Sequence, residues 1–330
     1  MRPFLKISFE HIAFCLGVIF ILAGCGGRKA ARGPAPSVRA FPMPADVPTM
    51  IVSQDEKIEW MAGHYWDRLL DTTGVWVCDT TYVNGVRKDD VEEQFGIWVS
   101  MIENLLPLPK AARASSHLFE SVQAFDAVRP ETNVFKEICS LSRKYFYDPN
   151  SPARNEDIYL PFVEKAAVSP SVPDSLKPSL KWEAHFCSLN RTGTVAADFS
   201  FREKNGRTRT LHGTKADRTL LIFSNPGCPE CARMIEGLSS PVLNSLIKGG
   251  KLAVVDIYID EDVDFWREHA SEYPSSWIVG YDPEGIIRKD LIYGVRALPS
   301  LYLLDRDKRI VLKDSPVEKV LSVLETTDNQ

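Results

Sequence analysis

Apolar residues recur every three or four positions between residues 53 and 189, which is the spacing of amphipathic helices. The clearest stripes are Ile58, Met61, Tyr65 and Leu69; Val91, Phe95, Trp98, Ile102 and Leu105; and Val134, Ile138, Leu141 and Tyr145. Prolines separate these stripes from one another. The pattern predicts five or six helices packed as a small bundle, the first of which begins at a capping box of Ser53 and Glu56.

The spacing of apolar residues along the chain changes after Thr192. Short runs at 198–201 and 208–211 flank Asn205-Gly206, a strong hairpin signal. Continuous apolar runs at 219–224 and 251–259 predict buried central strands. Further strands are predicted at 301–304 and 309–312, and further helices after Cys228, at 264–272 and at 317–324. This alternation predicts an α/β domain.

The chain of 330 residues is long enough for two domains. We expect a two-domain protein in which an all-α bundle is followed by an α/β domain. The helical domain spans 46–190 and the α/β domain spans 191–330. Residues 1–24 are a signal peptide, and 25–45, rich in Gly, Pro, Ala and Arg, are a flexible tether.

The first 25 residues resemble a bacterial lipoprotein signal. Arg2 and Lys6 precede an apolar run at 12–22, which is too short to span a bilayer as a helix. The run ends in Leu22-Ala23-Gly24-Cys25, and the resemblance implies that Cys25 is acylated after cleavage before it. We expect a periplasm-facing cell-envelope lipoprotein in the outer membrane, bound to the bilayer through Cys25. The alternatives are an ordinary signal peptide and an uncleaved anchor.

Composition narrows the function classes. The net charge is −5, with 39 Lys and Arg against 44 Asp and Glu, so nothing favours a nucleic-acid partner. The glycine-rich and serine motifs of nucleotide-binding proteins and serine hydrolases are absent. The cysteines are too few for a disulfide scaffold in a chain of this length, so their positions matter more than their number.

Cys228 and Cys231 carry the strongest chemical signal. They lie three residues apart, directly after a predicted buried strand and at the predicted start of a helix. The first turn of a helix exposes unpaired N–H groups and the positive end of the macrodipole, which favour a thiolate at Cys228. Cys231, one turn further, is expected to be buried and to resolve a mixed disulfide. A CxxC pair in this context predicts thiol–disulfide exchange.

The stretch 193–313 resembles thioredoxin-like domains of the TlpA/ResA type. The resemblance rests on an entry segment at 193–199, the strand and CxxC at 221–231, and Ala297-Leu298-Pro299 before a strand. It implies a cis proline at Pro299 beside the redox pair, and substrate contacts at Leu298 and Pro229. The N-terminal part, with the stretch Tyr147–Glu156, resembles the helical domain of unknown function found before such domains in lipoproteins.

The expected function is therefore a membrane-anchored thiol–disulfide oxidoreductase with Cys228, Cys231 and Pro299 at its site and no cofactor. Its partners are protein disulfides and a membrane electron donor that the sequence does not identify. The alternative is a non-enzymatic envelope lipoprotein, in which the helical domain binds a partner and the thioredoxin fold is a scaffold. An insulin-reduction assay distinguishes these two functions: the activity should depend on both Cys228 and Cys231 in an oxidoreductase and on neither in a non-enzymatic lipoprotein.

Two features bear on the chemistry, of which the first is a departure from the family pattern. The strand before the CxxC carries Leu221 and Ile222 where thioredoxin has a buried acid, so this role has no evident holder. Glu230 lies between the two cysteines and Arg233 is the nearest cation. A carboxylate there disfavours the thiolate, which predicts a reducing couple tuned by Glu230.

Three cysteines remain after these assignments: Cys78, Cys139 and Cys187. They are expected to be small buried apolar residues, although Cys139 and Cys187 could pair if their helices touch. The histidines are scattered, and Cys228 and Cys231 lack a second pair of ligands. No metal site is therefore expected.

Overall fold

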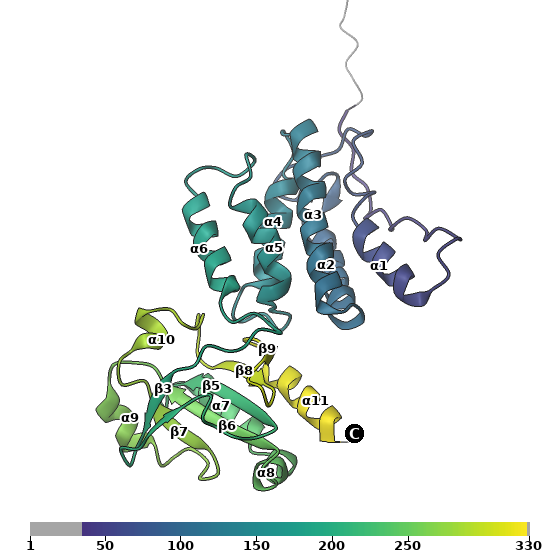
Figure 1. Cartoon of the computed structure of the whole chain (residues 1–330). Coiled ribbons are helices and arrows are strands. Elements are labelled where there is room, and N and C mark those ends of the chain that lie inside the picture. The colour runs from purple at the N-terminus through teal and green to yellow at the C-terminus, as the bar shows by residue number, and fades with distance from the viewer. Residues whose placement is uncertain (1–34, 329–330) are drawn as a thin grey trace, which may run out of the picture. The chain divides into compact units, whose positions relative to one another are not determined.

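Six helices form the first half of this computed structural model, which describes residues 35–328 (Figure 1). They are α1 (Gln54–His64), α2 (Lys88–Leu105), α3 (Leu108–Val128), α4 (Val134–Phe146), α5 (Glu156–Ala166) and α6 (Lys177–Ser188). The predicted helical half, 46–190 in the sequence, therefore has the predicted number of helices. Cys25 and the signal peptide lie outside the described residues.

Aromatic rings fill the core of this half. Phe95 and Trp98 of α2 have centroids 5.5 Å apart, and the Phe119 ring of α3 meets Phe162 of α5 edge-on at 5.0 Å. Such edge contacts add to the free energy of burying the rings. The predicted first stripe is only partly helical, because α1 ends at His64 and the buried Leu69 follows it in a turn.

The N-terminus of the helical half differs from the prediction in three ways. Ser53 precedes α1, but its side chain makes no capping hydrogen bond, so the expected capping box is not formed. A two-stranded hairpin joins β1 (Tyr82–Val83) to β2 (Val86–Arg87) through Asn84 and Gly85, both with positive φ. This Asn-Gly turn is the same hairpin signal recognised at 205–206.

The third difference concerns the predicted tether. Ser37 pairs with Trp76, and the Arg39 N–H donates to the Gly85 carbonyl at 2.8 Å. The Arg39 guanidinium also donates to the carbonyls of Asn84 and Leu69, both at 3.0 Å. Residues 37–41 therefore belong to the helical half and are not part of a free tether that reaches residue 45.

The second half is a seven-stranded mixed sheet with the order β4-β3-β7-β6-β5-β8-β9. Its strands are β3 (Ser200–Glu203), β4 (Thr208–Thr210), β5 (Arg218–Ser224), β6 (Leu252–Tyr258), β7 (Ile278–Tyr281), β8 (Ser300–Leu304) and β9 (Ile310–Leu312). The central strands β5 and β6 are parallel, and β8 runs antiparallel to β5. The strands predicted from apolar runs are all present within a few residues of their expected ends.

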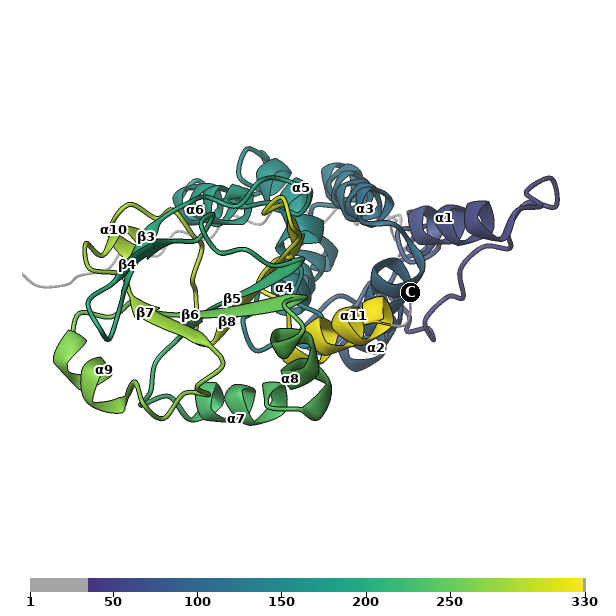
Figure 2. The ribbon, with the colours of Figure 1, turned by 60° about the horizontal axis from the view of Figure 1, so that its bottom comes forward.

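Helices cover both faces of the sheet (Figure 2). They are α7 (Pro229–Leu238), α8 (Pro241–Lys248), α9 (Val263–His269), α10 (Ile286–Lys289) and α11 (Val317–Asp328). Leu220 and Ile222 of β5 pack with side chains of α7, α8 and α11 on one face. Leu221 and Phe223 pack on the other face with Phe199 and Ile287. Alternate residues of β5 therefore serve two separate cores, which is why the run is continuously apolar.

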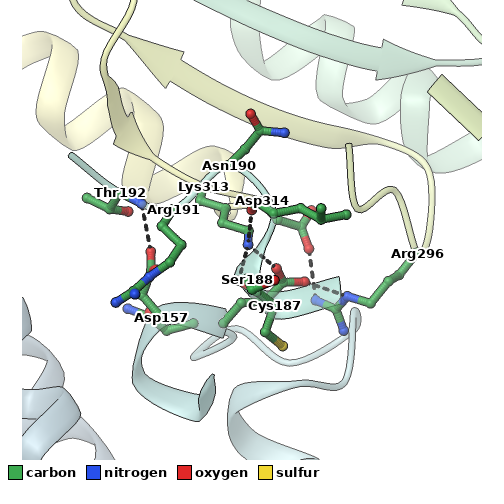
Figure 3. A network of polar contacts seen from close by, with 12 residues as sticks. Asp157, Cys187, Ser188, Asn190, Arg191, Thr192, Arg296, Lys313 and Asp314 are labelled. Carbon is green, nitrogen blue, oxygen red and sulfur yellow. Dashed lines mark hydrogen bonds and ion pairs between the residues drawn. The ribbon is translucent and has the colours of Figure 1, made fainter. Parts of the chain in front are cut away.

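The two halves meet at a buried polar cluster, and Pro36–Gln330 clusters as one compact unit. The Lys313 ammonium donates to the carbonyls of Cys187 and Leu189 at the end of α6 (Figure 3). The same ammonium pairs with Glu156 at 2.7 Å. Among residues 35–328, no helix combines the length and apolar character needed to cross a bilayer.

Candidate redox site

The CxxC pair lies where β5 passes into α7. The Asn225 side chain accepts from the Gly227 N–H at 2.8 Å, and the Cys228 N–H donates to the Asn225 carbonyl at 3.1 Å. This turn ends at Cys228, which is the N-cap of α7, and Pro229 occupies the first helical position. Proline is favoured there because its ring already has a helical φ and it has no N–H to leave unpaired.

Cys228 is the accessible sulfur of the pair. Its side chain is half-buried, and its Sγ accepts from the Cys231 N–H at 3.3 Å. The Sγ also lies 3.7 Å from the Leu298 carbonyl, and the Leu298–Pro299 peptide bond is cis. The structure thus brings together Cys228, Cys231, Leu298 and Pro299, whose roles were predicted from residues far apart in the sequence. Pro229 is exposed beside them.

Cys231 is the buried sulfur, with 1% of the residue exposed. Burial raises the pKa of its thiol, and the hydrogen bond and charge of Cys228 and the charge of Asp256 raise it further. Both cysteines are free thiols, so this is the dithiol form of the site. A proton must leave Cys231 before it can attack a mixed disulfide.

Asp256 is a site residue that the sequence analysis missed. It is fully buried on β6, opposite Ile222 of β5, and burial raises the pKa of its carboxyl to about 7. The Ser224 hydroxyl donates to it at 2.7 Å and lies 3.0 Å from the Tyr273 hydroxyl. The strand before the CxxC carries no acid, as the sequence indicates, and the structure places a buried acid on the neighbouring strand instead. Its signal was a lone acid within the apolar run 251–259.

Glu230 is exposed on the first turn of α7, and its charge is not isolated. The Arg233 guanidinium donates from Nε to Glu230 at 3.1 Å and forms an ion pair with it. Residues three apart on a helix are neighbours, so a cation one turn further reaches back to Glu230. The electrostatic effect expected from Glu230 is correspondingly weaker than the motif alone suggests.

The other described cysteines lie away from this pair and are unpaired, including Cys139 and Cys187. Burial raises the pKa of Cys139 to about 12 and raises that of Cys187 as well. Thiols of this kind are unreactive at neutral pH. Within residues 35–328, no group of three or more His, Cys, Asp and Glu side chains is placed to hold a metal ion.

Comparisons with known proteins match both halves of the chain. The model of a domain of unknown function, DUF5106, matches residues 24–185. The crystal structure of a thioredoxin-like protein from Bacteroides caccae is 34% identical, covers 88% of this chain and 99% of its own, and has a TM-score of 0.75. A search of curated proteins found no match.

Two further structures match about two fifths of the chain. The C-terminal domain of an uncharacterized protein from Bacteroides fragilis is 44% identical over 41% of this chain and 98% of its own, with a TM-score of 0.40. A thiol:disulfide interchange protein from a Bacteroides species is 20% identical over 42% of this chain and 91% of its own, with a TM-score of 0.38.

The sheet, the CxxC pair at the start of α7 and the Leu298–Pro299 turn beside it define a thioredoxin-like protein. The chain belongs to the family of thioredoxin-like proteins that the Bacteroides caccae structure represents. In this chain the match to DUF5106 covers most of the helical half.

Proposed function

We propose that this protein is a thiol–disulfide oxidoreductase that acts on disulfides in proteins. The observation that supports this best is that Cys228, half-buried at the N-cap of α7, lies one helical turn from the buried Cys231. The Cys231 N–H, 3.3 Å from the Cys228 sulfur, stabilises negative charge on that sulfur, as does the helix terminus.

The exchange proceeds in two displacements. The Cys228 thiolate attacks one sulfur of the substrate disulfide, and the other substrate sulfur leaves as a thiolate. The Cys231 thiolate then attacks the Cys228 sulfur, releases the second substrate thiol and leaves a Cys228–Cys231 disulfide. The substrate gains two electrons and the dithiol loses two.

Asp256 is proposed to take the proton that Cys231 loses. The charge of Asp256 acts on Cys231, and a pKa of about 7 lets this carboxyl both accept and return a proton near neutral pH. The Ser224 hydroxyl donates a hydrogen bond to the carboxyl, and the Tyr273 hydroxyl in turn lies 3.0 Å from the Ser224 hydroxyl. Asp256 thus supplies a buried base from a strand adjacent to the one that leads into the CxxC.

We also propose that the protein works as a reductant. The burial of Cys231 and the nearby acid disfavour a thiolate there, and a dithiol with a poorly stabilised thiolate gives a reducing couple. Oxidised protein is then reduced again by an electron donor in the membrane. The measured equilibrium with glutathione tests this, and a potential near that of strong periplasmic oxidants would contradict it.

The test of the activity is insulin reduction by dithiothreitol. Wild-type protein should accelerate it, and Cys228→Ser and Cys231→Ser should each abolish the acceleration. Cys139→Ser is the matched control, because this free thiol lies on α4, away from the redox pair, and it should retain the wild-type rate. Equal rates in all four proteins would instead favour the alternative of a binding protein on a thioredoxin scaffold.

Anchoring forms a separate proposal that rests on residues 2–25. We propose that Cys25 is acylated and holds the protein on the periplasmic side of the outer membrane. Metabolic labelling with a fatty-acid analogue should mark the wild type and not Cys25→Ala. Label that persists in the variant would refute acylation at Cys25, and separation of the two membranes tests the location.

A further inference from the structure

The turn at 297–299 is fixed at both of its ends to one carboxylate. Arg296, directly before the turn, forms an ion pair with Asp314 Oδ2 at 2.9 Å (Figure 3). Ser300, directly after the turn, donates its hydroxyl to Asp314 Oδ1 at 2.8 Å. All three side chains are buried. The two oxygens of a single buried carboxylate therefore hold the turn from both sides.

The turn borders the more accessible sulfur of the redox pair. The Cys228 thiol donates to the Leu298 carbonyl, which lies in the middle of the turn, across 3.7 Å. A hydrogen bond of this kind favours the protonated thiol, and the negative end of the carbonyl dipole disfavours the thiolate. Since the thiolate is the attacking form, the position of the turn bears on how reactive Cys228 is.

The helical half contacts the residue that precedes this turn. Glu156, at the start of α5, pairs with Arg296 Nε at 2.7 Å and with Lys313 at 2.7 Å. Tyr147, directly after α4, places its ring against the Arg296 guanidinium, with 4.2 Å between Cζ and the ring centroid. A guanidinium over an aromatic face is attracted to it. A carboxylate and a ring of the helical half thus hold Arg296 together with Asp314.

The helical half also contacts Asp314 directly. Arg154 Nε, from the segment between α4 and α5, donates to the Asp314 backbone carbonyl at 2.8 Å. Asp314 has a φ of 42°, which is uncommon for a residue with a side chain. A backbone conformation of this kind persists where surrounding contacts fix it. Both residues that fix the turn, Arg296 and Asp314, are therefore fixed in their turn by the helical half.

Joining the two halves does not by itself account for an ionic cluster here. Taking charges out of water costs free energy, and apolar residues of similar size commonly join buried surfaces as well or better. An arginine offers something that apolar packing does not, because its planar guanidinium holds its partners in fixed directions. The cluster therefore defines the position of Arg296 more sharply than adhesion between the halves requires.

We propose that the helical half positions the 297–299 turn against Cys228 through Arg296, and thereby sets the reactivity of that sulfur. Arg296 touches no reacting atom, so it is a positioning residue. This inference rests on the proposed exchange function and gives the helical half a part in it. Releasing Arg296 should let the Leu298 carbonyl move away from Cys228, which favours the thiolate.

The experiment measures alkylation of Cys228 by iodoacetamide in the reduced, full-length protein. Peptide mass spectrometry gives the rate for Cys228 alone, at pH 7 and at pH 10. The rate at pH 10 reports access of the reagent to the sulfur, since an ordinary thiol is mostly ionised there. The ratio of the rate at pH 7 to that at pH 10 therefore reports the thiolate fraction at neutral pH, with access divided out.

Three variants release the turn. Arg296→Met keeps an unbranched side chain but loses both acids, and the ratio should rise about threefold or more, as expected for loss of one hydrogen bond. Tyr147→Leu and Glu156→Gln remove only the contacts from the helical half, and each should raise the ratio about twofold. Circular dichroism establishes that each variant is folded. If Arg296→Met is not, the other two variants decide.

Lys313→Met is the matched control, because it breaks the same cluster on its other arm. The Lys313 ammonium binds Glu156 and the carbonyls of Cys187 and Leu189 at the end of α6. This variant loosens the junction and leaves the ion pair between Glu156 and Arg296 in place. Its alkylation ratio should equal that of the wild type.

The possible failures differ from one another. A wild-type ratio in folded Arg296→Met would overturn the proposal while the exchange activity stands. A wild-type ratio in both Tyr147→Leu and Glu156→Gln would overturn it as well, because Asp314 alone would then hold the turn. So would an equal rise in Lys313→Met, since general loosening would explain the effect. If wild-type protein does not reduce insulin, the proposed function fails, and the alkylation ratios still decide whether Arg296 positions the turn.

Discussion

Two buried acids lie in contrasting surroundings, one at the junction of the two halves and one behind the CxxC. Glu156 is 2% exposed and pairs with two cations, Arg296 and Lys313, at 2.7 Å each. Asp256 is 1% exposed and pairs with none, and its Oδ2 has no hydrogen-bond partner. Glu156 and Asp256 are almost equally buried, so the difference in their chemistry comes from the groups that surround each carboxyl.

The difference follows from the cost of removing charge from water. Two cations beside Glu156 offset part of that cost, although burial still raises the pKa of this carboxyl above its ordinary value. The cluster is therefore a structural link whose members depend on one another. Asp256 receives one hydrogen bond from Ser224, and its carboxyl therefore holds a proton up to a pH of about 7. A buried acid without a cation is suited to proton transfer, and one with two cations is not.

The largest expected effect comes from breaking the link at the junction. Glu156→Gln leaves Arg296 and Lys313 buried without their shared counter-charge, which should lower the free energy of unfolding by about 3–5 kcal/mol. Chemical denaturation measures this. Glu236→Gln, an exposed change on α7, should alter it by less than about 0.5 kcal/mol. A loss below about 1 kcal/mol for Glu156→Gln would show that the cluster does not hold the halves together.

The pH dependence of stability sharpens the comparison. The unfolded chain releases the Asp256 proton near its ordinary pKa of 3.8, whereas the folded protein keeps it to about 7. Folding therefore binds a proton between these values, and stability from this group is lost as pH rises through them. Between pH 5 and pH 8 the loss is of the order of 3 kcal/mol.

Asp256→Asn should remove this loss. The free energy of unfolding of the variant, relative to that of the wild type, should therefore increase as pH rises from 5 to 8. Denaturation at several pH values measures it, and Asp264→Asn, an exposed change on α9, should keep the wild-type slope. Parallel wild-type and Asp256→Asn curves would contradict a raised pKa at Asp256.

A smaller effect is expected on the second displacement. Asp256→Asn should slow the attack by Cys231 about a hundredfold, because no buried base takes its proton. Mixed disulfide with substrate should accumulate in rapid-quench experiments, and the wild-type inflection near pH 7 should disappear from the rate profile. Unchanged resolution in the variant would leave Asp256 as a structural residue only.

The smallest effect should come from the exposed acid. Glu230→Gln removes a negative charge near Cys228 and stabilises its thiolate, which raises the reduction potential. Glu230 is exposed and paired with Arg233, so we expect a shift below about 30 mV, measured against glutathione. A larger shift, or one toward lower potential, would show that Glu230 tunes the couple more directly than its ion pair allows.

Most helices and strands could be predicted because the signal for each lies within a few consecutive residues. The strand β5, the helix α7 and the hairpin around Asn205-Gly206 follow from runs and turns of a few residues. The short helix α8 was missed, because eight residues carry little periodicity. The Asn84-Gly85 hairpin carried the same signal as 205–206 and was overlooked within a helical region.

The two acids show why the rest of the site was harder to predict. An acid in the first turn of a helix is ordinarily explained by the helix dipole, so nothing near Glu156 marks it as buried. Its partners lie more than a hundred residues later in the chain. Asp256 did carry a local signal, a single acid in a buried strand, but only the sheet register places it beside β5.

The attachment of residues 37–41 changes where the folded body begins. The Arg39 guanidinium, bonded to the carbonyls of Arg68, Leu69 and Asn84, holds the chain against the helical half about ten residues before the composition predicts structure. If Cys25 carries the lipid as proposed, the spacer is residues 26–35, which even fully extended covers only about 35 Å. A spacer of that length would keep residue 36 within about 35 Å of the bilayer, so substrates would have to approach the membrane surface to the height of the folded body.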